Sequence, residues 1–135
     1  MTDSQRHPAD DNFYLRTLLG EEAFLAPLGG LDRRHLERAK AVLDQFSVVI
    51  ILEKFEEQLV QLQEAFQWTV SKRWIYKKRT TKRRRANITE DAMALIRDQN
   101  ALDSELYQHA VQVATALTDT AVAAAKAKSE VEIRG

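Results

Sequence analysis

The sequence predicts a mostly helical α/β protein with a single buried strand near residues 47–52, in a chain of 135 residues. Two observations lead to this prediction. Several segments repeat apolar residues at helical spacing, with polar residues on the opposite face. Residues 48–52 are instead apolar without interruption, and four consecutive ones are β-branched, which restricts their side chains in a helix. A helix, a short apolar run and a second helix form the pattern of an α/β unit.

The alternative interpretation of this run is one continuous helix over residues 31–68. In such a helix the run would be apolar on every side, whereas both flanking segments are apolar on one side only. A strand buried on both faces needs neighbouring strands, because each unpaired backbone group costs about 1–3 kcal/mol. We find no second comparable strand in the sequence. We therefore expect the rest of the sheet to lie in residues outside this chain.

The segments before the run have clear boundaries. Residues 13–19 carry apolar side chains at helical spacing, and Gly20 is a typical stop signal. Residues 21–30 end in APLGG, which predicts a loop. Asp32 is the expected N-cap of the next helix, which has one apolar stripe formed by Leu36, Ala39, Leu43 and Phe46.

Helical spacing resumes after the run, over residues 53–68. Phe66 and Trp68, at the end of this segment, are most simply core residues. Residues 77–87 have no apolar period and are predicted to form a loop.

Two further helices and a tail are expected in the last third of the chain. Thr89 caps a helix that ends near Asn100, and Asp103 is the expected cap of the following helix. Residues 118–135 are rich in alanine and helical by propensity. The predicted organisation is a disordered N-terminus at residues 1–10, a domain portion at 11–117 and a helical tail at 118–135.

The formal net charge of zero conceals an uneven distribution. Residues 72–85 contain nine lysines and arginines and no acid, while the remainder holds eleven bases against twenty acids. A cationic segment on an acidic body indicates an anionic ligand more directly than the net value does. The chain has no cysteine, which excludes disulfides and thiolate metal sites, and its three histidines have no metal-ligand spacing. No apolar run reaches the roughly 18 residues of a membrane span, so we expect no signal peptide or anchor here.

Four elements follow one another in order along residues 11–117. They are an N-x-x-x-R-x-L element (Asn12, Arg16, Leu18), an L-x-x-A-K-x-x-L-x-x-F helix (Leu36, Ala39, Lys40, Leu43, Phe46), an apolar run ending at Glu53, and an I-x-x-x-N-x-L-D-x-x-L-Y element (Ile96, Asn100, Leu102, Asp103, Leu106, Tyr107). In this order they resemble the C-terminal part of Golgi carbohydrate sulfotransferases, the heparan sulfate 6-O-sulfotransferases most of all.

The resemblance implies a P-loop-like α/β fold and an enzyme at the lumenal side of the Golgi membrane. It implies sulfuryl transfer from 3′-phosphoadenosine 5′-phosphosulfate to a sugar hydroxyl, with a glycan acceptor and no metal. In this family the phosphosulfate loop and the catalytic base lie upstream, and neither is found in this chain. We therefore expect an inactive C-terminal segment that needs the missing N-terminal part of the same enzyme.

The basic segment is where the resemblance implies co-substrate contacts. The candidates are Tyr76, Thr80, Thr81, Lys82 and Arg83, because cations and hydroxyls bind phosphate oxygens through charge-assisted hydrogen bonds. The alternative is a solvated cationic loop with no specific ligand. Two other functions stay open: a helical interaction module, and a protein that binds nucleic acid or another polyanion through residues 72–85. Nucleic acid is the less favoured partner, since the acidic remainder would repel it.

Isolated residues outside the basic segment have simpler roles. Arg16 is expected to pair with an acid and hold its helix on the sheet. Glu53 lies where the sites of α/β proteins gather, or simply begins the next helix. His35 and His109 are expected to be structural or exposed.

Overall fold

The computed structural model describes residues 10–69 and 88–134. Of these residues 75% are helical and none lies in a β-strand, so the predicted α/β fold with a buried strand is wrong. The described residues form two compact units. The first unit comprises residues 10–45 and 88–109, and the second comprises residues 46–69 and 110–134.

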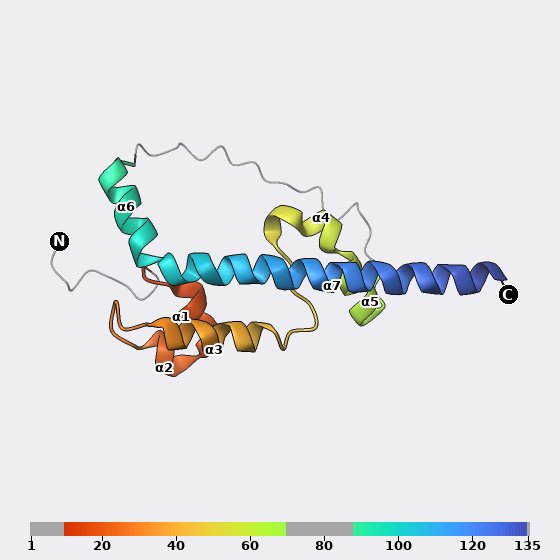
Figure 1. Ribbon diagram of the computed structural model, residues 1–135, viewed down its shortest axis with the longest axis horizontal. Coiled ribbons are helices and arrows are strands. Elements are labelled where there is room, and N and C mark those ends of the chain that lie inside the picture. Colours follow the sequence, from red (N-terminus) through yellow and green to blue (C-terminus); the bar gives the residue numbers. More distant parts are fainter. Residues whose placement is uncertain (1–9, 70–87, 135) are drawn as a thin grey trace. The chain divides into compact units, whose positions relative to one another are not determined.

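The first unit is built around three helices that lie side by side (Figure 1): α1 (Phe13–Leu19), α2 (Glu21–Phe24) and α3 (Arg33–Leu43). It also contains α6 (Glu90–Gln99) and the first residues of α7 (Ala101–Arg134). Its core is a small apolar cluster drawn from α1, α2, α3, α7 and the loop before α3: Leu15, Ala23, Leu31, Leu36, Ala39 and Leu106. The sequence did not predict α2, which occupies part of the expected loop.

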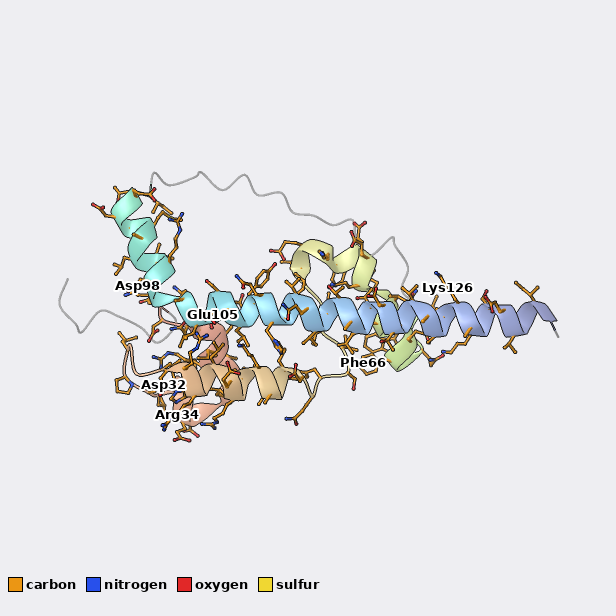
Figure 2. The ribbon with its side chains drawn as sticks, in the orientation of Figure 1. Asp32, Arg34, Phe66, Asp98, Glu105 and Lys126 are labelled. Carbon is orange, nitrogen blue, oxygen red and sulfur yellow. The ribbon has the colours of Figure 1, made fainter. Side chains whose placement is uncertain are left out.

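Local capping fixes the helix starts, as the sequence predicted. The Asp32 carboxylate accepts the backbone N–H groups of Arg34 and His35, at 2.9 and 3.2 Å, and so caps α3 (Figure 2). The Thr89 hydroxyl accepts the N–H of Ala92 at 3.3 Å and caps α6. Each bond satisfies a donor that has no partner inside the helix. Asn100 ends α6, as expected.

The apolar run is neither the predicted strand nor part of a continuous helix. Residues 46–51 leave α3 and reach the short 3₁₀ helix η3 (Leu52–Lys54), and Ile51 has extended dihedral angles, φ −90° and ψ 125°. Gln61 Oε1 accepts the N–H of Val49 at 3.0 Å, and Gln61 Nε2 lies 2.9 Å from the Val49 carbonyl oxygen. Gln58 Oε1 accepts the N–H of Ile51 at 2.7 Å. Two side-chain amides therefore form the bonds that a neighbouring strand would form, which is why the run needs no sheet.

The second unit joins this extended segment to two short helices and the rest of α7. The helix predicted over residues 53–68 begins in η3 and is divided at Leu59 into α4 (Phe55–Gln58) and α5 (Val60–Phe66). Gln61 Nε2 also lies 3.1 Å from the Ala114 carbonyl oxygen and 2.9 Å from Thr118 Oγ1, which fixes α5 to α7. Residues 118–134 belong to α7, which continues without a break to Arg134. Within the described ranges, no helix is both long and apolar enough to cross a membrane.

Candidate functional site

The predicted co-substrate residues lie outside the described part of the chain. Tyr76, Thr80, Thr81, Lys82 and Arg83 all fall between residues 70 and 87, as does the loop predicted for residues 77–87. Their role stays a prediction. The structure does place the residues of the first and last of the four sequence elements, and it brings them together in one buried polar network.

Asp103 links α7 to the first turn of α1 in this network. Its carboxylate accepts the backbone N–H of Tyr14 at 2.9 Å and that of Leu15 at 2.8 Å. Asp103 was expected to cap its own helix, but α7 begins at Ala101, and the carboxylate caps a helix nearly ninety residues earlier in the chain. The prediction failed because a cap supplied from a distant segment leaves no local spacing signal.

Asn12 is the second link between the two elements. Its Oδ1 accepts the N–H of Asp103 at 3.0 Å, and its own N–H donates to Asn100 Oδ1 at 3.2 Å. Asn12 Nδ2 donates to the Asp11 carboxylate at 2.7 Å. Asn12 has a left-handed backbone, with φ 47°, which asparagine tolerates better than most side chains do. Asn12, Asn100 and Asp103 were all matched in the sequence, and here they are in direct contact.

Arg16 is fully buried and binds the end of α2 and the loop that follows α2. Its guanidinium pairs with the Asp11 carboxylate at 2.6 Å. It also donates to the carbonyl oxygens of Asp11, Ala23, Phe24, Ala26 and Pro27, at 2.7 to 3.3 Å. The expected acidic partner is therefore confirmed. The expected sheet is not, because Arg16 instead joins α1 to the end of α2 and the loop after it.

Burial and hydrogen bonding shift the pKa values of the two carboxylates of the network, Asp11 and Asp103, in opposite directions. Burial by itself raises the pKa of Asp11, but hydrogen bonds from Gly29, Arg16 and Asn12, with the charge of Arg16, hold that pKa below its ordinary value of 3.8. Burial raises the pKa of Asp103 above its ordinary value and outweighs the hydrogen bonds from α1, and the charge of Asp11 raises it further. The Arg16 charge thus stabilises the ionised form of Asp11.

An open cavity of about 460 Å³ adjoins the network in the first unit. The residues that line it include the polar Asp10, Asp11, Asn12, Asp98 and Gln99 and the apolar Leu28, Leu31, Leu95 and Leu102. The buried side-chain nitrogen and oxygen atoms of the described residues all have hydrogen-bond partners, so the network is a closed structural unit.

The other residues considered from the sequence have structural or surface positions. His35 completes the cap of α3, and His109 lies 2.7 Å from an Asp44 carboxylate oxygen, so both histidines are structural. Glu53 is exposed on η3. Phe66 and Trp68 are not core residues, because they are 52% and 58% exposed. No group of three or more His, Cys, Asp or Glu in the described ranges could hold a metal ion.

Three residues that matter to the structure were missed from the sequence. Asp11 precedes the matched asparagine, and its pairing with Arg16 at i+5 is a signal that could have been used. Gln58, the last residue of α4, and Gln61, near the start of α5, are buried three residues apart after an apolar run. A polar pair at helical spacing beside a run without strand partners is the pattern that could have identified them.

No protein-family model, curated protein or solved structure matches the chain.

Proposed function

We propose that this chain is a C-terminal segment of a carbohydrate sulfotransferase, an enzyme that moves a sulfuryl group from 3′-phosphoadenosine 5′-phosphosulfate to a sugar hydroxyl. One observation supports the proposal. Asn12 and Arg16 come from one matched element and Asn100 and Asp103 from another, and hydrogen bonds join them through Asp11 into one network. Residues that match a family pattern by coincidence are not expected to contact one another in the folded chain, whereas residues of a shared structural framework are.

The proposal concerns the activity and does not include the sheet that the structure contradicts. In this proposal the first unit is a framework, and the segment between α5 and α6 supplies co-substrate contacts. Lys82 and Arg83 bind phosphate oxygens as cations, Thr80 and Thr81 donate hydroxyl hydrogen bonds, and Tyr76 supplies the aromatic contact to the co-substrate. The phosphosulfate loop, the base and most of the glycan site belong to an N-terminal part of the same Golgi enzyme, so this segment is inactive alone.

Calorimetric titration with 3′-phosphoadenosine 5′-phosphate, the desulfated product, tests the proposal. We compare the wild-type chain with a site variant, Thr80→Ala, Thr81→Ala, Lys82→Gln and Arg83→Gln. The control is Lys77→Gln and Lys78→Gln, which removes the same charge from the same segment. We expect the site variant to lose at least about tenfold in affinity for the nucleotide, or about 1.4 kcal/mol of binding free energy. The control should lose about threefold in affinity at most. Equal losses in both variants, or no binding by the wild type, would reject the proposal.

The second candidate function is a helical module that binds a polyanion. The observation in its favour is that the described residues are helical without a strand, while residues 72–85 hold nine cations. Such binding weakens steeply with salt, because each neutralised phosphate releases counterions. Titration with duplex DNA and with heparin at several salt concentrations tests it. Equal loss of polyanion binding in the two charge variants, with no nucleotide binding, favours this candidate over the first.

A further inference from the structure

The cavity beside the polar network has the size of a small-molecule site. Its volume is about 460 Å³, and ligand sites in proteins span about 300–1,000 Å³. Three parts of the first unit line it: the segment before α1, the loop between α2 and α3, and the junction of α6 with α7. Segments far apart in the sequence therefore share one hollow.

Leucine side chains give the cavity its apolar area. Leu31 is 8% exposed and belongs to the core cluster. Leu28 and Leu102 are partly buried, and Leu95 is 50% exposed. The apolar lining thus runs from the core to the exposed edge of the cavity. Each methylene group that a ligand buries fully against such a lining strengthens binding by about fourfold, so the leucines favour a ligand with an aliphatic body.

The buried polar groups at the cavity already have partners. The Asp11 carboxylate accepts hydrogen bonds from Arg16, Asn12 and the Gly29 N–H, at 2.6 to 2.8 Å. Arg16 also neutralises the charge of Asp11. Asn12 Oδ1 accepts the N–H of Asp103. The exposed edge of the cavity is therefore where a ligand finds its polar contact.

This exposed edge is acidic. Asp98, in the last turn of α6, is exposed and lines the cavity (Figure 2). The ion pairs formed among the described residues do not include Asp98. Asp10 adds a second exposed carboxylate, and the described residues that line the cavity include no lysine, arginine or histidine. Because α6 ends where α7 begins, at Asn100, the opposite partial charges of the two helix ends offset each other, and the carboxylates set the sign of the potential.

We propose that this cavity binds a small amphiphilic cation, an alkylammonium ion whose aliphatic body lies along the leucines and whose charged end contacts Asp98. Two separate features select this class of ligand: the leucine lining selects the aliphatic body, and the acidic edge selects the positive charge. The inference uses described residues of the first unit alone and does not rest on the proposed function. A lysine side chain ends in the same chemical group, and one arm of the experiment separates a free ion from a peptide.

Titration of the full chain with butylamine, hexylamine and octylamine at pH 7, where these amines are protonated, tests the proposal. Amide NMR spectra follow the binding. We expect the affinity to rise by about twofold to fourfold for each added methylene group. Octanoate has the same aliphatic body with the opposite charge and should bind about tenfold more weakly than octylamine. The saturable shifts should be largest at the amides of Leu28, Gly29, Ala101 and Leu102, which line the cavity.

Two variants examine the two features of the site separately. Asp98→Asn removes the charge at nearly constant size and should weaken octylamine binding by about twofold to fivefold, the range of an exposed ion pair. Asp119→Asn removes the same charge from an exposed position of the second unit and should leave this affinity unchanged. Leu95→Ser should reduce the dependence of affinity on chain length. Because Asp98 and Leu95 are exposed, we expect the folded state to survive both changes, and urea unfolding checks this.

Each outcome decides part of the proposal. Equal binding of octylamine and octanoate, or octylamine binding that is unchanged in Asp98→Asn, overturns the selection of a cation. Shifts confined to amides of the second unit overturn the location, and absence of saturable octylamine binding overturns the site altogether. Tighter binding of the peptide acetyl-Leu-Lys-Leu-amide than of octylamine, with the same loss in Asp98→Asn, shows a peptide site and overturns the free ion. The nucleotide titration uses other residues, so failure of one proposal leaves the other standing.

Discussion

Replacement of Asp103 by alanine removes the cap of α1. The carboxylate accepts two backbone N–H groups, from Tyr14 at 2.9 Å and Leu15 at 2.8 Å, and Asp103 is 8% exposed. Leu15 is fully buried, so its N–H has no access to water once the carboxylate is gone. The Tyr14 side chain is 72% exposed, and its N–H lies closer to solvent. The two lost bonds therefore have unequal consequences.

The magnitude follows from these two positions. A hydrogen bond to a charged group contributes about 1.5–3 kcal/mol, and a buried donor left without a partner costs about 1–3 kcal/mol. The Leu15 bond carries most of this cost, while the Tyr14 N–H recovers part of its loss from water. The substitution also removes the unfavourable burial of a carboxylate, which raises the pKa of Asp103. We expect a net loss of about 2–4 kcal/mol in the free energy of unfolding.

Urea unfolding followed by far-ultraviolet circular dichroism measures this loss. For a slope of about 2 kcal/mol per molar urea, the midpoint falls by about 1–2 M. Hydrogen exchange adds a local readout, since the amides of Tyr14 and Leu15 lose protection first. The control is Asp119→Ala, an exposed aspartate on the same helix, for which we expect a change within about 0.5 kcal/mol. A midpoint for Asp103→Ala equal to that of the wild type, with both amides still protected, would refute the capping role.

Three further predictions concern other buried groups. Gln61→Ala leaves the backbone of Val49 unpaired and should lower the thermal midpoint by the equivalent of about 2–3 kcal/mol, whereas Gln63→Ala on the exposed face of α5 should have little effect. Arg16→Lys keeps the charge but loses the planar fork that bonds several carbonyl groups, and it should cost about 2–4 kcal/mol in urea unfolding. The lowered pKa of Asp11 contributes stability that is complete above its ordinary value of 3.8 and lost as the pH falls through the folded value. Asp11→Asn should therefore reduce the difference in urea midpoint between about pH 5 and about pH 3, and an unchanged difference would contradict this assignment.

Local signals in the sequence predicted local structure well. The caps at Asp32 and Thr89 act within three residues, so their spacing is visible in the sequence. The stop at Gly20 has the same character, because the chain leaves α1 there with a φ of 87°, which glycine adopts more easily than other residues. These features are confirmed because sequence neighbours alone determine them.

The errors share one physical cause. The strand prediction assumed that only another strand can bond an extended backbone, and the amides of Gln58 and Gln61 do so instead. The Asp103 prediction assumed that a cap serves its own helix, and the carboxylate serves α1. Both assignments depend on a side chain that bonds the backbone of another segment, and apolar periodicity does not report such bonds. The separation is 7 or 12 residues for the glutamines and 88 or 89 for Asp103. The candidate co-substrate residues, between Tyr76 and Arg83, lie outside the described ranges and stay a prediction.

The glutamine amides beside the apolar run also bear on the solubility of the unfolding protein. Five consecutive apolar residues without charge or proline resemble the segments that assemble into cross-β fibrils. In the folded chain, Gln61 and Gln58 occupy hydrogen-bonding groups of Val49 and Ile51 that another molecule would need for strand pairing. When the second unit unfolds, the same backbone groups become available for strand pairing with another molecule of this protein. Aggregation on heating should therefore begin at this run, and loss of Gln61 should advance it.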